Sequence, residues 1–330
     1  MYFCSPMNIL LTQSLDVLDN IRLNFSPQGL LIMNITIACI MFGVALDMKF
    51  AGFRQLIRKP LPLITGIISQ VVLLPLVTFL LIMVLQPSQG VALGMLLVAA
   101  CPGGNISNFI SSLSKGNVEL SVSLTAVTTI SAIIITPLNF AFWGGLYAST
   151  SPLLRPIEID PVQMLLTVFI LLGIPLIAGI LFSLRFPRTT QHILKPVRWA
   201  SIIVFTLFVL GALGANFSNF LQYIELIFVI VLLHNGIALL TGYLFAALMK
   251  MDQRNRKTIT IETGIQNSGL ALALIFTPRI FPQDLQLGGM AFIAAWWGIW
   301  HIISGMGLAF FWCRRHKSIH VTAGDTPEKK

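Results

Sequence analysis

Charged residues are scarce in this chain. Only 10% of its 330 residues are Asp, Glu, Lys or Arg, whereas 56% are hydrophobic, and the mean hydropathy is +0.85. A soluble domain carries about 25% charged residues. The composition therefore excludes an ordinary soluble protein and predicts a polytopic membrane protein.

Paired cysteines and enzyme motifs are missing as well. The four cysteines, Cys4, Cys39, Cys101 and Cys313, form no C-x-x-C motif, so we predict neither a disulfide framework nor a zinc site. We interpret Cys101 as a small buried apolar residue. Without an H-E-x-x-H or G-x-S-x-G motif, and with few carboxylates, the sequence favours a protein that is not an enzyme and has no enzymatic cofactor.

A nucleic-acid partner is not expected, because no basic stripe is interleaved with aromatic residues outside the apolar runs. Each of those runs reaches about 20 residues, the length that a helix needs to cross a hydrocarbon core roughly 30 Å thick. None has the alternating polarity of a transmembrane barrel strand. We predict an all-α fold with nine transmembrane helices, at residues 30–48, 61–85, 89–112, 118–146, 162–184, 199–216, 222–249, 257–278 and 287–312.

The basic residues fall on one side of this arrangement. If the nine spans alternate in direction, 18 of the 21 Lys and Arg residues share the side of the C-terminus, and only Arg22, Arg155 and Arg279 lie opposite. Basic loops stay in the cytoplasm, where they meet anionic lipid headgroups. The pattern predicts an outside N-terminus and a cytoplasmic C-terminus. A missed span would mix the charges, so the segregation also supports the count.

Two predicted spans contain residues that interrupt a helix. In the third span, Pro102 removes a backbone donor, and Gly103 and Gly104 weaken the helix in mid-membrane. In the eighth, Gly264 and Gly269 flank a polar cluster. Backbone freed at this depth is tolerated only if it is buried in protein or lines a wet cavity. We expect discontinuous helices at both places.

These two spans are five apart, an odd shift. If spans one to four correspond to spans six to nine, the two units run in opposite directions and the fifth span has no partner. Inverted repeats with paired discontinuous helices are typical of secondary transporters, with a site near the bilayer midplane. We therefore predict an N-terminal interfacial segment (residues 1–28, without a cleaved signal peptide), a transporter domain (29–312) and a cytoplasmic tail (313–330).

A carboxylate, Glu262, lies inside the eighth predicted span. At a helix centre it costs about 3 kcal/mol, and no Lys or Arg inside a span is available to pair with it. A bound cation, a proton on the carboxyl group or a water-filled cavity would each offset that cost. Hard cations prefer oxygen ligands. The spans offer such ligands in Gln70, Ser107, Asn108, Gln266 and Asn267.

Other polar residues have two interpretations each. Ser121, Thr125 and Thr128 form a hydroxyl stripe on one helix face, which either faces this site or bonds to the carbonyls of its own helix. His234 is interpreted as a bonded core residue rather than a proton relay. His301 follows Trp296, Trp297 and Trp300, and either lines a cavity or belongs to the core.

The chain resembles the bile acid:sodium symporter family, in its bacterial branch. The resemblance rests on "CPGGNISNF", "GNVELSVSLTAVTT" and "TIETGIQNSGLALAL", with shorter matches in "IMFGVALDM", "LLHNGIALL" and "WHIISG", in order between residues 40 and 305. It implies panel and core domains, crossed helices beside two Na⁺ sites, and an organic anion carried with the ions. Some bacterial relatives have ten spans, so this chain lacks a peripheral one.

The resemblance also implies roles for particular residues. One Na⁺ would be held by Ser107, Asn108, Ser121, Thr125 and Glu262, and the other by Gln70, Glu262, Gln266 and the carbonyls of Thr263 and Ile265. Asn267 and His301 match positions that face substrate. Glu119 replaces a small residue of some relatives, and we expect it to be solvated.

The sequence therefore predicts a Na⁺-coupled symporter of an organic anion, either bile-acid-like or a small carboxylate, in the inner membrane. Na⁺, the anion and membrane lipids are the expected partners, without an obligate protein partner. Two alternatives stay open: a proton-coupled carrier or exporter of related architecture, and a membrane receptor that binds without transport.

Overall fold

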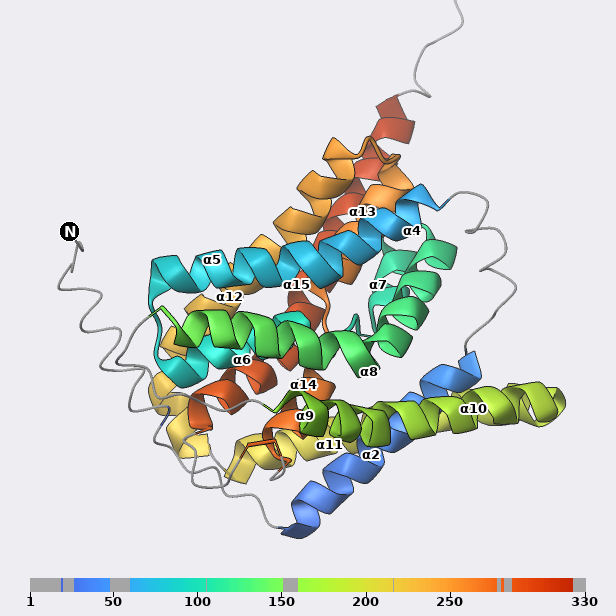
Figure 1. The fold of residues 1–330 in the computed structure, drawn as a ribbon. Coiled ribbons are helices and arrows are strands. Elements are labelled where there is room, and N and C mark those ends of the chain that lie inside the picture. The colour runs from blue at the N-terminus through green and yellow to red at the C-terminus, as the bar shows by residue number, and fades with distance from the viewer. Residues whose placement is uncertain are drawn as a thin grey trace, which may run out of the picture.

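The computed structural model describes residues 19, 27–47, 60–104, 106–150, 160–215, 217–277, 280–281 and 287–322, and within them it contains helices but no strands (Figure 1). The all-helical class predicted from composition is confirmed. Most of the predicted interfacial segment, residues 323–330 of the predicted cytoplasmic tail, and also Arg22, Arg155 and Arg279 lie outside the described residues. The helices are α2 (Pro27–Asp47), α4 (Leu61–Ile68), η1 (Ser69–Leu73), α5 (Leu74–Leu85), α6 (Gln89–Ala100), α7 (Ile106–Leu113), α8 (Val118–Ala148), α9 (Pro161–Val168), η2 (Phe169–Gly173), α10 (Ile174–Arg185), α11 (Pro187–Ala215), α12 (Phe217–Leu248), α13 (Gln253–Gly264), α14 (Ser268–Ile275) and α15 (Gly288–Thr322).

Helices occupy every predicted span. Among the described residues, five segments are long and apolar enough to cross a membrane: Leu61–Leu85, Val118–Ala148, Pro161–Arg185, Ile224–Leu248 and Gly288–Arg314. They match the second, fourth, fifth, seventh and ninth predicted spans. The other four positions hold α2, α6 with α7, α11, and α13 with α14. That these also cross the membrane stays a prediction.

Two long spans share an irregularity that the sequence analysis did not foresee. Leu61–Leu85 and Pro161–Arg185 each contain a five-residue π-helical turn, η1 or η2, followed by a proline, Pro75 or Pro175. A proline has no N–H for the carbonyl four residues earlier, and a local π turn accommodates the loss. In the first span, Asn139 of α8 donates its Nδ2 to the carbonyl of Val71, at 2.9 Å.

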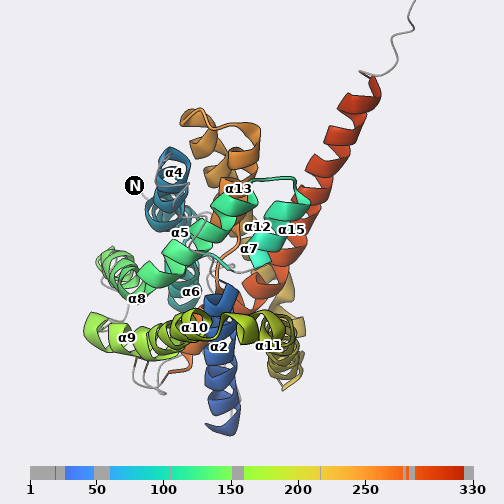
Figure 2. The same cartoon turned by 90° about the vertical axis from the view of Figure 1, so that its right-hand side faces the viewer.

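The helices pack in two groups. In one, α2 contacts both α10 and α11, and these helices lie together in the lower part of both views (Figure 1, Figure 2). In the other, α6, α14 and α15 share the largest apolar cluster of the described residues, with fully buried side chains such as Leu97, Leu274 and Trp297. Contacts of α8 with α9 and of α14 with α2 join the groups.

Both predicted interruptions are present. Residues 101–105 separate α6 from α7, and residues 265–267 separate α13 from α14. The second break is short. The side chain of Asn267 accepts a hydrogen bond from the N–H of Leu270, at 3.0 Å, and this N-cap begins α14 directly after Asn267. Gly264 is the last residue of α13 and Gly269 is the second residue of α14, so the two glycines lie on either side of the break.

The two breaks lie against each other. Gly103 and Gln266 form an isolated antiparallel bridge. Beside it, the N–H of Gly104 donates to the carbonyl of Ile265 at 2.9 Å, and the N–H of Asn267 donates to the carbonyl of Pro102 at 2.8 Å. Each break therefore supplies hydrogen-bond partners for the backbone groups that the other one frees, as burial requires.

Asp19 is the residue of the N-terminal 26 that the structure describes. It is buried, with Oδ1 accepting from the hydroxyl of Ser88 at 3.0 Å and Oδ2 accepting from the N–H of Gly90 at 2.8 Å. A Cβ at Gly289 would lie 2.1 Å from Oδ1, so the carboxylate also touches the start of α15. Negative charge is favourable at helix N-termini.

Candidate functional site

Glu262 is fully buried in the last turn of α13, directly before the break. Its Oε1 accepts hydrogen bonds from the hydroxyl of Ser107 in α7, at 2.6 Å, and from that of Ser121 in α8. Its Oε2 accepts from the hydroxyl of Thr125 in α8, at 3.1 Å. In the described part of the chain, no cationic side chain is among the partners of this carboxylate. Two helices thus direct hydroxyl groups at one carboxylate of a third.

Each of the two interpretations of the hydroxyl stripe on α8 holds for some of its members. Ser121 and Thr125 face Glu262, whereas Thr128 donates to the carbonyl of Leu124 in its own helix, at 2.8 Å. Asn108 lies beside the carboxylate, and its Oδ1 is 3.3 Å from the hydroxyl of Thr125. The first predicted ligand group is therefore assembled around Glu262.

The second predicted group meets at the same place. Gln70 lies in the π turn η1 and donates its Nε2 to the carbonyl of Glu262, at 2.5 Å. Gln266, in the break, donates its Nε2 to the carbonyl of Thr263, at 2.9 Å. The Oε1 atoms of Gln70 and Gln266 are both buried without a hydrogen-bond donor. An unpaired buried oxygen is costly, and a bound cation would satisfy it.

Gly103 keeps the space between these groups open. A Cβ at this position would lie 3.0 Å from both Nε2 of Gln70 and Oε2 of Glu262. The carbonyl of Ile265, another predicted ligand, accepts the N–H of Gly104 and keeps its second lone pair. The carboxylate, hydroxyls, carboxamides and carbonyls together form an oxygen-rich site that suits a hard cation.

The two residues expected to face substrate are placed differently. Asn267 is partly exposed and caps α14. His301 is buried in α15, between Gly298 and Gly305. At those glycines α15 approaches the second break, because a Cβ there would lie 2.7 Å from Oγ of Ser268 and 2.9 Å from Cδ1 of Ile265, respectively. No hydrogen bond joins Asn267 to His301 in the part of the chain that the structure describes.

His234 and Cys101 match their interpretation as core residues. The Nε2 of His234 lies 2.8 Å from the hydroxyl of Thr78, and its ring centroid is 4.6 Å from that of Trp297. Cys101 is buried in the main apolar cluster. Glu119 is exposed in the first turn of α8, as expected.

Sequence reasoning missed Asn235. This buried carboxamide donates its Nδ2 to the carbonyl of Gly264 at 2.7 Å, and its Oδ1 accepts from the hydroxyl of Ser304 at 2.5 Å. It therefore connects the end of α13 to α15. A carboxamide inside an apolar span costs desolvation energy unless it forms hydrogen bonds. This reasoning drew attention to Gln70, and it applies equally to Asn235. Ser69, whose hydroxyl lies 2.8 Å from that of Thr263, was also missed.

Comparison with known proteins agrees with this geometry. Residues 34–223 match the model of the sodium bile acid symporter family. An uncharacterized sodium-dependent transporter of Bacillus subtilis, YocS, is 34% identical over 285 residues, which are 86% of this chain and 84% of that protein. A probable chloroplastic sodium/metabolite cotransporter of rice, BASS2, is 29% identical over 84% of this chain and 62% of its own length. The human sodium/bile acid cotransporter 4 is 26% identical over 72% of this chain and 54% of its own length.

The match to YocS covers most of the chain, and the family model includes the first break but ends before the second. The helices described above are those of an integral membrane protein. The relatives are sodium-dependent by name, which identifies Na⁺ as the coupling ion of the family. The chain therefore belongs to the sodium bile acid symporter family, a family of sodium-dependent membrane transporters.

Proposed function

We propose that this protein is a symporter that carries an organic anion, bile-acid-like or a small carboxylate, together with Na⁺ across the inner membrane by alternating access. The observation that carries the proposal is the surroundings of Glu262: a fully buried carboxylate without a cationic partner in the described residues, next to the unpaired Oε1 atoms of Gln70 and Gln266. A bound cation would balance the charge and complete both carboxamides.

The predicted ligands divide into two Na⁺ sites that share Glu262. The first uses its carboxylate with oxygens from α7 and α8, namely those of Ser107, Asn108, Ser121 and Thr125. The second uses Gln70, Gln266 and the carbonyls of Thr263 and Ile265, around the second break. Two monovalent cations around one carboxylate leave a net positive site.

That positive charge explains the choice of an anion as substrate. The site lies beside the N-terminus of α14, whose dipole favours a carboxylate. Asn267 at this terminus and His301 on α15 are the proposed substrate contacts. Ions and substrate would then stabilise the same state, which couples their movements.

The architecture offers a mechanism for alternating access. We assign α2, α10 and α11 to a panel, and the helices that carry both breaks to a core that moves against it. The crossing of the breaks supports an inverted repeat, with α2 to α8 as one unit and α11 to α15 as the other. The nine-span order then places both breaks near the midplane.

The proposal is tested by replacing Glu262 with Gln, which keeps the shape and removes the charge. We expect sodium chloride to raise the Tm of the wild-type protein more than potassium chloride does, because ligands of the native state stabilise it. Glu262→Gln should lose this difference and also lose sodium-driven counterflow of radioactive Na⁺ in proteoliposomes. Glu119→Gln, which removes an exposed acid of α8, is the matched control.

Equal stabilisation by both salts, or full Na⁺ dependence in Glu262→Gln, would sink the sodium assignment. If flux instead follows an imposed pH gradient without Na⁺, a proton on Glu262 takes the place of the ion. Na⁺-dependent stabilisation without any counterflow would indicate a receptor.

A further inference from the structure

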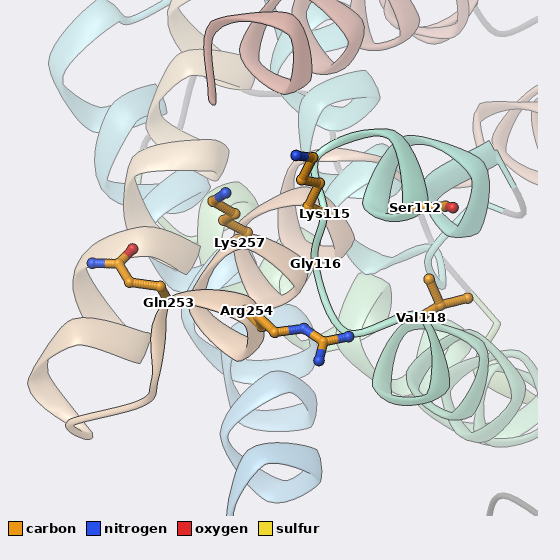
Figure 3. A pocket seen from close by; sticks show the side chains of 7 residues that line it. All are labelled: Ser112, Lys115, Gly116, Val118, Gln253, Arg254 and Lys257. Carbon is orange, nitrogen blue, oxygen red and sulfur yellow. The ribbon is translucent and has the colours of Figure 1, made fainter. Parts of the chain in front are cut away.

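A second polar site lies away from Glu262, where the turn between α7 and α8 meets the start of α13. It is an open cavity of about 420 Å³ (Figure 3). In this view the amino groups of Lys115 and Lys257 lie above the Gly116 backbone, and the guanidinium of Arg254 extends beneath it toward Val118. Ser112 and Gln253 complete the lining.

The charge of this cavity is positive. Three cationic side chains line it and no acidic residue does. None of the three forms an ion pair with a carboxylate among the described residues. Lys257 donates its Nζ to the carbonyl of Ser114, at 3.1 Å, and lies 5.7 Å from the ring of Trp312. The like charges of Lys115 and Lys257 repel each other.

The backbone holds Lys115 at this place in an unusual conformation. Its φ is +57°, in the left-handed region that favours glycine. The turn is nevertheless fixed, because the N–H of Gly116 donates to the carbonyl of Ser111 at 2.8 Å, and the N–H of Asn117 donates to the hydroxyl of Thr258 at 2.8 Å. A glycine would suit the turn better than a lysine, so turn stability alone does not explain the cationic side chain.

We propose that this cavity binds the phosphate group of an anionic ligand. Two ammonium groups and a guanidinium that line one cavity, with no acidic residue in its lining, suit a phosphate, which accepts charge-assisted hydrogen bonds from such groups. Serine hydroxyl and carboxamide groups in the lining add neutral donors. The phosphate comes either from the headgroup of an anionic lipid or from a soluble phosphate compound, and the experiment below separates these sources.

Occupancy would also bear on transport, and this consequence rests on the proposed function. The cavity joins the end of α7 to the start of α13, the two helices that carry Ser107 and Glu262. A bound phosphate would hold together the ends of these two helices that lie away from the proposed Na⁺ sites. Binding itself depends only on the cavity, so it is measured without Na⁺ or transport.

The test is titration calorimetry of the purified protein in a neutral detergent. The probes are inorganic phosphate and dihexanoyl phosphatidylglycerol. Dihexanoyl phosphatidylcholine, a zwitterionic lipid whose phosphate charge is balanced by its own choline, is the comparison. The variant Lys115→Gly/Arg254→Gln removes two charges; Lys257, which bonds to the backbone, is left in place. Lys250→Gly is the control, because Lys250 also has a left-handed φ, of 55°, but does not line the cavity.

We expect the wild-type protein and Lys250→Gly to bind phosphate, phosphatidylglycerol or both, and the double variant to bind at least about tenfold more weakly. Binding of phosphatidylglycerol alone assigns a lipid headgroup, and binding of inorganic phosphate assigns a soluble ligand. The Tm of each variant, measured without a probe, shows whether the variant folds. If the double variant does not fold, the single variant Lys115→Gly is used in its place. Absence of binding by the wild type, equal binding of phosphatidylcholine, or unchanged binding by the variant would overturn the proposal.

Discussion

Gly103, in the first break, lies directly against the polar atoms around Glu262 and has no side chain to fill the space between them. The missing Cβ would lie 3.0 Å from both the Gln70 carboxamide and the Glu262 carboxylate. The glycine therefore has a role beyond loosening the helix, which was its interpretation from the sequence. It leaves room for something that the two polar groups can share.

We expect Gly103→Ala to weaken Na⁺ binding by about tenfold or more, which corresponds to roughly 1.4 kcal/mol. The methyl group would occupy ion space while the fold is kept, because most of the neighbouring contacts are to side chains. The readout is the sodium chloride concentration that gives half of the maximal rise in Tm. Gly236→Ala is the control, since a Cβ there meets nothing within 4 Å. An unchanged midpoint in Gly103→Ala would mean that the ion does not sit between Gln70 and Glu262.

At the scale of helices, the π turn η1 decides where Gln70 points. Pro75 leaves the carbonyl of Val71 without its usual donor, and Asn139 of α8 supplies one at 2.9 Å. The turn thus joins three features: a proline, a carboxamide on another helix, and the proposed ligand Gln70. The proline was visible in the sequence, but the partner helix that completes the turn was not.

This arrangement makes Asn139 and Pro75 energetically coupled. Asn139→Ala leaves a partly buried carbonyl unpaired and should lower the free energy of unfolding by about 1–3 kcal/mol. In the background of Pro75→Ala, the restored N–H can serve Val71, and the loss should shrink by about 1 kcal/mol. The measurement is the free energy of unfolding in mixed micelles for the four proteins of a double-mutant cycle: the wild type, Asn139→Ala, Pro75→Ala and the double variant.

Ser131→Ala is the comparison for that cycle. Its hydroxyl bonds only to the carbonyl of Thr128 in its own helix, at 3.1 Å, so its removal should have little effect. Additive losses for Asn139 and Pro75 would show that the side chain does not replace the missing backbone donor.

At the scale of the whole molecule, contacts join distant segments that the charge pattern assigns to the same side of the membrane. Lys257, before the eighth span, bonds to Ser114, after the third, and lies over Trp312 near the end of the ninth. All three positions were assigned to the cytoplasmic side from the charge pattern. Asp19 meets the starts of α6 and α15, both assigned to the outside.

The orientation is tested with single cysteines in a protein whose native cysteines are replaced by serine or alanine. Gln253 and Ser149 are both exposed, and the charge pattern places them on opposite sides. We expect a membrane-impermeant maleimide to label Ser149→Cys in intact spheroplasts and Gln253→Cys only in inverted vesicles. Labelling of both from the same side would contradict the alternating order of the nine spans.

The sequence determined by itself what depends on composition and on short stretches. The membrane class follows from the length of the apolar runs, the break after α6 from Pro102 and its glycines, and the need to compensate Glu262 from the cost of a charge in mid-span. The resemblance to a known family then named the residues that gather at Glu262. The exact start of the helix after the second break depends on a local side-chain cap, Asn267.

Tertiary structure decided which distant groups meet. Ser107 and Glu262 are 155 residues apart, and Gln70 and Glu262 are 192 apart, so no local pattern states that they touch. The same holds for the pairing of the two breaks and for the meeting of Lys115 with Arg254 in one cavity. Membrane insertion depends on local hydrophobicity, which a sequence displays, whereas a binding site depends on how folded helices pack, which only the three-dimensional arrangement fixes.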